Sequence, residues 1–360
     1  MMSKILVLAN FSGGLYDFRN EVLLELLKKH EVYVSIPDEV RRKELEEEGC
    51  HIVHTPLNRR GMNPLEDIGL MMRYNKILNE IKPDLVMTYT IKPNIYGGFI
   101  CRMKKLSYIT TITGLGSTFQ GTGLMKKLIV LMYKGALKGA SCIFFQNMKN
   151  KSIFEENKIC GKKSVLVNGS GVNLQRHQLE PYPQEEQIRF LFVGRIMKEK
   201  GIEEFLDAAK MLHAENLVFE ILGGCDEDYQ EKLNEYETKG LIRYHGFQKD
   251  VKPFLHKASA LVLPTYHEGM SNVLMEASAT GRPVIATKIS GCKEIFEEGV
   301  TGFGCEPQSS QSLIEAMDKF LALSKEERAQ MGRNARAKME REFDRRQIVD
   351  VYIKEIENLV

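Results

Sequence analysis

The amino-acid sequence predicts an α/β protein with two doubly wound parallel-sheet domains and a cleft between them. Short apolar strands alternate with helical segments through most of the 360 residues, which is the pattern of parallel sheets covered by helices on both faces. The alternation breaks at Leu174–Gln187, where prolines and charges replace it, and a second series begins directly afterwards. A chain of this length is also expected to form two domains.

The first domain is expected over residues 1–174. It opens with a strand at Lys4–Ala9, a loop that contains Gly13 and Gly14, and a helix from about Asp17 to Lys29. The glycine pair can bring backbone amides close to a ligand, or it can be an ordinary turn, because the G-x-G-x-x-G pattern is absent. The other predicted strands of this domain are Val32–Ile36, Leu85–Thr90, Tyr108–Thr113, Cys142–Gln146 and Ser164–Val167.

Polar side chains gather where two of these strands end. Tyr89 lies at the end of one strand and is followed by Lys92 and Asn94, and Thr113 ends the next strand. Because ligands of open α/β sheets bind beyond the carboxyl ends of the strands, these residues are candidates for the wall of a cleft. The alternative is ordinary loop polarity.

A helix expected over Gly123–Lys138 combines bulky apolar residues with Lys126, Lys127, Lys134 and Lys138. Such a helix can lie on an anionic bilayer surface. It can equally cover a sheet while its lysines extend into water. No segment has the roughly 18 apolar residues of a spanning helix, and the N-terminal apolar run is too short for a signal peptide.

The second domain is expected over residues 188–344, followed by a terminal helix within residues 345–360. Its predicted strands are Ile188–Val193, Leu217–Leu222, Ile242–Tyr244, Ala260–Leu263, Pro283–Thr287 and a short one near Gly302. The predicted helices are Gly201–Leu212, Gln311–Leu323, Lys325–Phe343 and Arg345–Leu359. The terminal helix has an apolar stripe made of Ile348, Val351, Tyr352, Ile356 and Leu359.

The stretch Pro264–Glu294 has the clearest indication of a binding site. Its loop ends with Gly269–Ser271 at the start of a helix that Ser271 or Asn272 can cap. The unpaired N–H groups of a helix start, together with the helix dipole, attract a phosphate group. The sequence therefore predicts a phosphate site at this turn.

Two carboxylates bracket the same turn. Glu268 precedes it, and Glu276 lies about a turn and a half into the helix. Each can accept hydrogen bonds from hydroxyl groups, so a phosphate site between them indicates a sugar nucleotide. The alternative is that Glu276 is an edge residue of a buried helix and that Glu268 is an ordinary loop charge.

Arg195 and Lys200 lie around a predicted strand-to-helix turn, F-V-G-R-I-M-K-E-K-G. Arginine offers a planar fork to phosphate oxygens and lysine a mobile point charge, near a helix start that also attracts anions. The alternative is a solvated, charged first turn. Gly223, which with Gly224 follows the next strand, can let a nucleotide base approach the backbone.

Composition excludes several classes of function. The net charge of +2 gives no case for nucleic-acid binding. The seven cysteines are scattered without a C-x-x-C pair, which fits reduced thiols in a cytoplasmic protein better than a disulfide frame or a zinc site. No cluster of histidines and aspartates is apparent, so we expect no metal requirement, with Arg195 and Lys200 supplying the positive charge.

The second domain resembles the retaining nucleotide-sugar glycosyltransferases with two facing Rossmann-like domains, the GT-B architecture. The resemblance rests on the Glu-x7-Glu motif E-G-M-S-N-V-L-M-E at 268–276, on F-V-G-R-I-M-K-E-K-G, and on the following G-R-P-V-I-A-T. In the first domain, R-R-G-M-N-P-L, T-Y-T-I-K-P-N-I-Y-G, T-I-T-G-L-G and N-G-S-G-V-N-L resemble bacterial enzymes that build capsule, O-antigen or lipid-linked oligosaccharide. The acceptor implied is a glycan or a sugar on undecaprenyl diphosphate at the inner face of the cytoplasmic membrane, and the terminal helix is expected to return toward the first domain.

The resemblance also implies residue roles. Arg195 and Lys200 would hold the donor diphosphate, with UDP the default nucleotide. Glu268 would hold hydroxyls of the transferred sugar, Glu276 the ribose hydroxyls, and Gly14 would pack against the diphosphate. The remaining donor-side candidates are Gly13, Gly223 and the backbone of Gly269, Met270, Ser271, Asn272 and Val273. The acceptor-side candidates are Arg59, Arg60, Tyr89, Lys92, Asn94 and Thr113.

The sequence departs from this family at one point. Many relatives have a histidine where this chain has Thr113, and Met87 stands where a second one is sometimes found. No general base is therefore assured, and the donor phosphate is expected to take the acceptor proton on the face from which the leaving group departs. The alternatives are a nucleotide-sugar 2-epimerase of the same fold and a catalytically silent sugar-nucleotide-binding partner.

Overall fold

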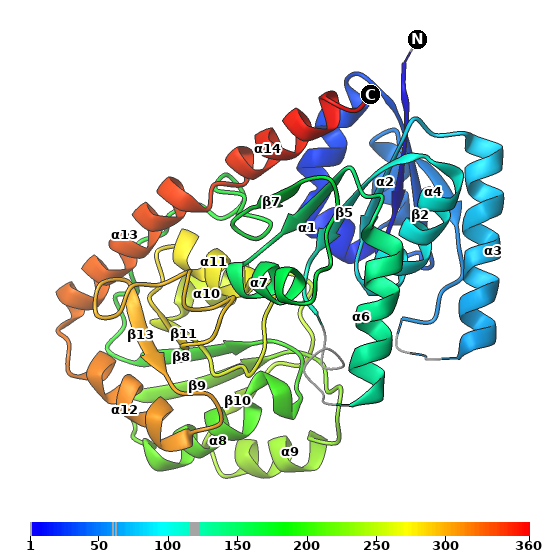
Figure 1. The fold of residues 1–360 in the computed structure, drawn as a ribbon. Helices are drawn as coiled ribbons and strands as arrows, with labels where there is room; N and C mark the ends of the chain where they lie inside the picture. Colours follow the sequence, from blue (N-terminus) through cyan, green and yellow to red (C-terminus); the bar gives the residue numbers. More distant parts are fainter. Residues whose placement is uncertain (1, 60, 62, 116–122) are drawn as a thin grey trace. The chain divides into compact units, whose positions relative to one another are not determined.

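A computed structural model describes residues 2–59, 61, 63–115 and 123–360. Its contacts divide the chain into two compact units: Met1–Ser170 with Arg346–Val360, and Gly171–Arg345. Each unit has its own parallel sheet, in the order β3-β2-β1-β4-β5-β6-β7 in the first and β10-β9-β8-β11-β12-β13 in the second (Figure 1). The predicted fold class, two doubly wound α/β domains, is confirmed.

The first unit follows the predicted order of strands and adds elements between residues 37 and 84. Its strands are β1 (Lys4–Leu8), β2 (Glu31–Ile36), β3 (His51–His54), β4 (Leu85–Tyr89), β5 (Ser107–Ile112), β6 (Cys142–Phe145) and β7 (Ser164–Leu166). Its helices are α1 (Ser12–Leu27), α2 (Arg42–Glu47), α3 (Pro64–Ile81), the π-helical turn η1 (Pro93–Gly97), α4 (Gly98–Lys104), α6 (Leu124–Leu137), α7 (Met148–Glu156) and most of α14 (Arg345–Glu357). The prediction missed the edge strand β3, which exposes both of its histidines and so lacks a continuous apolar run.

Successive residues of each central strand enter two different cores, as a sheet covered on both faces requires. Ile5 and Val7 of β1 pack with α1 and α14, whereas Leu6 and Leu8 pack with α3, α4 and α6. On the first of these faces, the ring of Tyr352 from α14 stacks on Phe144 of β6 with ring centres 4.0 Å apart. Helix α14 is thus an integral part of the core of the first unit.

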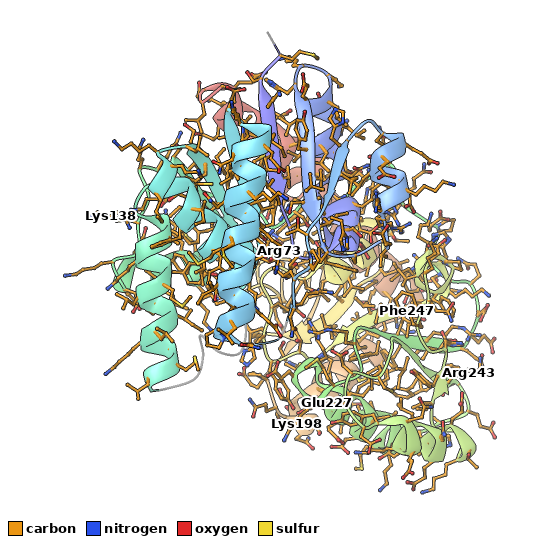
Figure 2. The ribbon with its side chains drawn as sticks, turned by 90° about the vertical axis from the view of Figure 1, so that its right-hand side faces the viewer. Arg73, Lys138, Lys198, Glu227, Arg243 and Phe247 are labelled. Atoms are coloured by element: carbon orange, nitrogen blue, oxygen red, sulfur yellow. The ribbon has the colours of Figure 1, made fainter. Side chains whose placement is uncertain are left out.

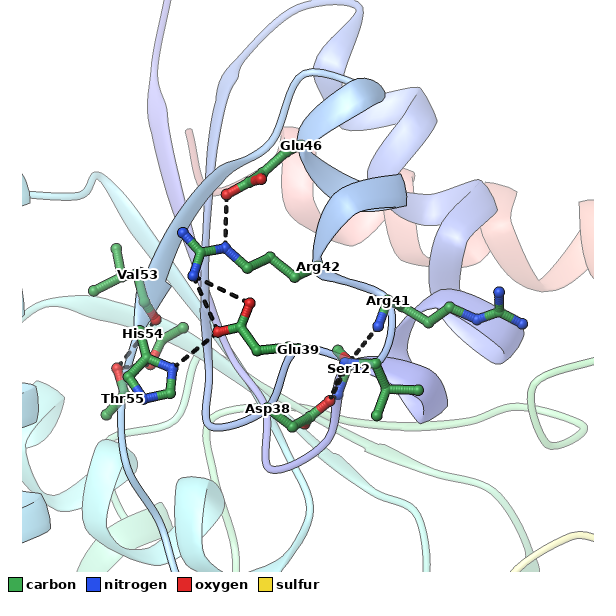
Figure 3. Close-up of polar contacts among 11 residues, drawn as sticks. Ser12, Asp38, Glu39, Arg41, Arg42, Glu46, Val53, His54 and Thr55 are labelled. Atoms are coloured by element: carbon green, nitrogen blue, oxygen red, sulfur yellow. Dashed lines mark hydrogen bonds and ion pairs between the residues drawn. The ribbon is translucent and has the colours of Figure 1, made fainter.

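Helix α1 begins at Ser12, not near Asp17 as predicted, so Gly13 and Gly14 lie in its first turn and not in a preceding loop. A distant carboxylate stabilises this early start: Asp38 accepts hydrogen bonds from the Ser12 amide (2.9 Å) and from its hydroxyl (Figure 3). The hydroxyl in turn accepts the Arg41 amide. Glycine disfavours helix by itself, and a cap 26 residues away is invisible to local patterns.

The second unit consists of the remaining elements. Its strands are β8 (Ile188–Val193), β9 (Leu217–Leu222), β10 (Arg243–Tyr244), β11 (Ala260–Leu263), β12 (Val284–Thr287) and β13 (Gly302–Cys305). Its helices are the 3-10 turn η2 (Lys198–Lys200), α8 (Ile202–Met211), α9 (Gln230–Thr238), α10 (Lys252–Lys257), α11 (Asn272–Ala279), α12 (Ser310–Leu321) and α13 (Lys325–Glu342). One continuous core, which includes Phe190, Leu261 and Leu274, fills this unit.

The segment 174–187, which the sequence suggested as a boundary, folds onto the second unit. The guanidinium of Arg282 is fully buried and donates to the carbonyls of Glu180 (3.2 Å) and Pro181 (2.9 Å). The same guanidinium donates to the carbonyls of Leu255 and His256 in the last turn of α10. Since a buried arginine needs such acceptors, it fixes this proline-containing segment to the domain instead of leaving it as a linker.

Candidate active site

The loop between β11 and α11 is fastened to the turn that follows β8. The amide of Tyr266 donates to the Glu199 carbonyl (2.9 Å), and the Thr265 hydroxyl donates to the same carbonyl (3.2 Å). The Tyr266 hydroxyl donates to the buried carboxylate of Glu204 on α8 (2.7 Å). These bonds hold two loops that are more than 60 residues apart in the sequence at the carboxyl ends of neighbouring strands.

Lys200 and Glu268 form an ion pair across these two loops, with Nζ 2.5 Å from Oε1. Their side chains are only 19% and 14% exposed. Gly201 makes the approach possible: its φ is +77°, and a Cβ there would lie 2.1 Å from the Pro264 carbonyl oxygen. The sequence identified both charged residues but did not predict that they touch.

Arg195 also has a carboxylate partner. Its guanidinium lies 2.5 Å from the Asp226 carboxylate in the loop after β9, and Glu227 accepts the Lys198 amide (2.8 Å). Sequence reasoning missed Asp226, which belongs to the D-x-D sequence Asp226-Glu-Asp228. Across the residues with described coordinates, no three His, Cys, Asp or Glu side chains are grouped closely enough to hold a metal ion.

Gly223 fulfils a packing requirement between two strands. Its φ is +149°, and a Cβ would lie 1.7 Å from the Gly194 carbonyl oxygen at the end of β8. Its amide donates to Gly246 and its carbonyl accepts the Tyr244 hydroxyl. A Cβ on the neighbouring Gly224 would meet nothing within 4 Å, so Gly224 is the more open of the two glycines.

The start of α11 differs in detail from the predicted phosphate site. Ser271 is the N-cap residue, but its side chain makes no capping bond and its amide already donates to the Gly291 carbonyl (2.9 Å). The Met270 side chain is buried in the core. Gly291, which the sequence did not suggest, has a φ of +93°, and a Cβ there would lie 2.9 Å from Cβ of Glu268. The Met275 amide donates to the Ser271 carbonyl (3.3 Å), which is the first hydrogen bond of the helix.

Glu276 lies beside a histidine that sequence reasoning missed. The Nε2 atom of His177 is 3.9 Å from Oε1 of Glu276, and His177 is only 7% exposed. Burial, followed by the charges of Arg176 and Arg345, lowers the pKa of His177 to about 4, so this imidazole is neutral at pH 7. His177 lies in the segment 174–187 that the sequence suggested as a domain boundary, and no motif pointed to it.

Two of the predicted acceptor-side residues are wrong as lining residues of a cleft. Tyr89 is 4% exposed within the core, and the Arg19 guanidinium lies 5.8 Å from its ring centre. Asn94 is also buried, where its amide donates to the Thr111 carbonyl (2.9 Å). The prediction assumed that polar side chains near strand ends face solvent, but Tyr89 and Asn94 are both buried within the first unit.

The other acceptor-side candidates are partly accessible. Arg59 is exposed and lies over the ring of Phe11, with 4.4 Å between the guanidinium carbon and the ring centre. Lys92 makes an ion pair with Asp67 of α3 (2.7 Å). Thr113 is half-buried, and Arg60 lies outside the described residues.

The buried His177 predicts a specific pH dependence of stability. Above pH 6.5 it is neutral in both folded and unfolded chains. Between pH 6.5 and 4, His177 takes up a proton only in the unfolded chain. The free energy of unfolding should therefore fall by up to about 3 kcal/mol as the pH decreases through this window. Urea unfolding at several pH values should show that His177→Gln removes this part of the slope.

A matched replacement of the exposed His213 by Gln should leave the slope as in the wild type. An unchanged slope in His177→Gln would show that His177 is not the group responsible.

Known protein families match both halves of the chain. The model described as "Glycosyl transferase 4-like" matches residues 4–147, and "Glycosyl transferases group 1" matches residues 176–338. The second match includes Arg195, Lys200, Glu268 and Glu276.

Individual relatives agree with these matches. The N,N'-diacetylbacillosaminyl-diphospho-undecaprenol alpha-1,3-N-acetylgalactosaminyltransferase of Campylobacter jejuni is 26% identical, over 98% of this chain and 97% of its own. The UDP-Gal:alpha-D-GlcNAc-diphosphoundecaprenol alpha-1,3-galactosyltransferase of Escherichia coli is 26% identical, over 83% of this chain and 82% of its own. The fold matches Anabaena HepE, crystallised with UDP-glucose, with a TM-score of 0.83 at 18% identity, over 99% of this chain and 100% of that one. The chain belongs to the group 1 glycosyltransferases, retaining enzymes with the GT-B fold.

Proposed function

We propose that this glycosyltransferase moves a sugar, with retention, from a UDP-sugar to a sugar on undecaprenyl diphosphate during synthesis of a surface polysaccharide. The observation that carries the proposal is the Lys200–Glu268 ion pair beside the start of α11. The names of the Campylobacter and Escherichia relatives support the lipid-linked acceptor, and the HepE complex supports a UDP-linked donor.

The ion pair is suited to the junction between a sugar and its phosphate. Lys200 has three N–H donors, of which Glu268 uses one, so two remain for phosphate oxygens. Glu268 retains acceptor capacity for hydroxyls of the transferred sugar. Arg195 adds a second cation near the diphosphate. Positive charge fixed at this point stabilises the leaving nucleotide diphosphate more than the intact donor, which lowers the barrier.

Glu276 is assigned to the ribose hydroxyls. It is the fifth residue of α11, a helix that is otherwise largely buried. Because the neighbouring His177 is neutral at pH 7, the imidazole does not form a charged ion pair with the carboxylate.

The acceptor proton needs a base, and Thr113 cannot supply one. In our proposal an oxygen of the donor phosphate takes this proton. The bond from the sugar carbon to the phosphate breaks while the bond to the acceptor oxygen forms on the same face, which retains the configuration. Lys200 and Arg195 supply the positive charge, so we expect turnover to persist in EDTA.

We also propose that the first unit rests on the inner surface of the cytoplasmic membrane. No helix in the described ranges combines the length and apolar character needed to cross a bilayer, so the contact is peripheral. Helices α3 and α6 run side by side, and both pack on η1 and α4 (Figures 1 and 2). Their N-terminal halves expose large apolar side chains: Leu65 (78%), Ile68 and Met72 on α3, and Leu124 (85%), Met125, Leu128 and Leu131 on α6.

Replacing each of the two glutamates of the motif by glutamine should affect different kinetic constants. Glu276→Gln removes a contact that is present in ground and transition states alike, so KM for the donor should rise while kcat changes less. Glu268→Gln should lower kcat while donor binding survives, because positive charge develops at the sugar as its bond breaks. The assay follows radiolabelled sugar from UDP-sugars into GlcNAc-diphospho-undecaprenol.

The exposed Glu235→Gln on α9 serves as a control that should behave as the wild type. The same assay separates the alternatives, since an epimerase would convert the free sugar nucleotide and a silent partner would only bind it. The same kinetic pattern in both glutamate variants would contradict the assigned roles.

Membrane contact predicts a charge effect on liposome binding. Each of four lysines in α6 or at its C-terminal end should contribute about 1 kcal/mol to the free energy of binding to anionic lipid. Changing all four to Glu should therefore weaken liposome binding, measured by co-sedimentation, at least roughly 100-fold. Binding of the wild type should also weaken with salt. The four positions are Lys126, Lys127, Lys134 and Lys138.

A control with four exposed lysines of the second unit changed to Glu should bind as the wild type. These positions are Lys210, Lys239, Lys249 and Lys293. Equal loss in both variants would mean that net charge, and not this face, determines binding.

A further inference from the structure

The first unit contains a pocket of about 440 Å³, lined by the acceptor-side candidate Lys92 and by residues that no motif identified. It lies at the carboxyl ends of β2, β3 and β4, with β1 between β2 and β4: Pro37 follows β2, Asn58 follows β3, and Lys92 follows β4. Residues 66–73 of α3 form the remaining wall, which ends at Arg73 near the middle of the helix (Figure 2). Pockets of this size at this end of a parallel sheet are the usual place for a ligand.

The polar groups of the pocket are fixed in place yet have unused bonding capacity. The Asp67 carboxylate accepts from Lys92 Nζ (2.7 Å) and from the Tyr96 hydroxyl (2.8 Å), which leaves lone pairs for further donors. Arg73 donates through Nη2 to the Pro56 carbonyl (3.0 Å). Its Nε is buried and has no hydrogen-bond partner among the described residues. A buried N–H without a partner is costly, so an acceptor from a ligand would stabilise it.

The charges of the pocket balance, which argues against a phosphate. Glu66 and Asp67 oppose Arg73 and Lys92, and Asp67 already forms an ion pair with Lys92. Two carboxylates beside a diphosphate would repel it, whereas hydroxyl and amide groups of an uncharged ligand can use both kinds of partner. The apolar part of the wall, made of Pro37, Pro56, Leu57 and Leu70, suits the C–H face of a sugar ring.

The pocket also lies next to the proposed membrane face. Asp67, Leu70 and Arg73 line it from the same two turns of α3 that expose Leu65, Ile68 and Met72 on the outside. A sugar linked to a lipid begins just above the bilayer surface. Residues on one short stretch of helix can therefore contact the membrane and receive the first sugar that emerges from it.

We infer that this pocket is the subsite for an uncharged sugar of the acceptor, held by Asp67 and Arg73. This assignment rests on the proposed function. It adds the chemical class that the subsite takes, a neutral hexose or N-acetylhexosamine, and two residues that sequence motifs did not identify.

Steady-state kinetics with GlcNAc-diphospho-undecaprenol test the inference. Asp67→Asn and Arg73→Met should each raise the acceptor KM about 10- to 100-fold, the usual effect of losing a hydrogen bond to a charged group. The donor KM and the slow hydrolysis of UDP-sugar without acceptor should change less than about twofold. The matched control Glu80→Gln, an exposed carboxylate on the same helix, should leave all these values unchanged.

Two inhibitors distinguish a sugar site from a phosphate site. Inhibition by methyl α-N-acetylglucosaminide should be lost in the Asp67 and Arg73 variants, whereas inhibition by farnesyl diphosphate should persist. Loss of farnesyl diphosphate inhibition alone, or an acceptor KM within twofold of the wild type in both variants, overturns the inference.

Folding and the proposed function have separate readouts. Thermal unfolding shows whether each variant is folded. If Asp67→Asn unfolds the protein because Lys92 loses its ion-pair partner, Arg73→Met still tests the pocket. If the wild type transfers no sugar to any lipid-linked acceptor, the proposed function fails. In that case saturation-transfer NMR with the methyl glycoside still tests the pocket, and absence of binding to the wild type overturns it.

Discussion

The ion pair between Lys200 and Glu268 is the interaction around which the second unit is arranged. A largely buried ion pair is stable only if the protein holds the two charged groups in contact, because separating them leaves an uncompensated charge away from water. The surrounding structure provides this in three ways: Gly201 lets the two loops touch, the Glu199 carbonyl binds Thr265 and Tyr266, and Gly291 packs against Glu268. None of these contacts is chemically reactive, yet each positions one of the two charges.

In the proposed function, the two units recognise different substrates. In the second unit, charged groups at the carboxyl ends of β8, β9 and β11 suit the anionic, hydroxyl-bearing donor. In the first unit, a pocket of balanced charge at the ends of β2, β3 and β4 suits an uncharged sugar, with exposed apolar side chains on the same helix. The same rule, that ligands bind beyond the carboxyl ends of parallel strands, thus yields different chemistry according to the loops.

Sequence patterns predicted all strands except β3, and the strand-loop-helix turn between β11 and α11, because buried parallel strands and helix starts leave local signals. They failed where a long-range contact decides the outcome. Asp38 starts α1 five residues before the predicted position, Arg282 binds the predicted boundary segment to the second unit, and Arg19 lies beside Tyr89 in the core. His177, Asp226 and Asp67 were missed for the same reason, since each acquires its importance from a partner far away in the chain. Lys200 and Glu268 were both identified from the sequence. Their contact was not, because it depends on the close approach of Gly201 to the Pro264 carbonyl, which no sequence pattern indicates.

A double-mutant cycle on kcat/KM tests most directly whether Lys200 and Glu268 act as one unit at the sugar–phosphate junction. Lys200→Met and Glu268→Gln should each lower kcat/KM about 10²–10³-fold, the size of losing a preorganised charge partner. Because each charge depends on the other for its position, the double variant should be at most about tenfold worse than the poorer single one. Near-normal turnover in either single variant, or losses that simply multiply in the double variant, would contradict the central role of this ion pair.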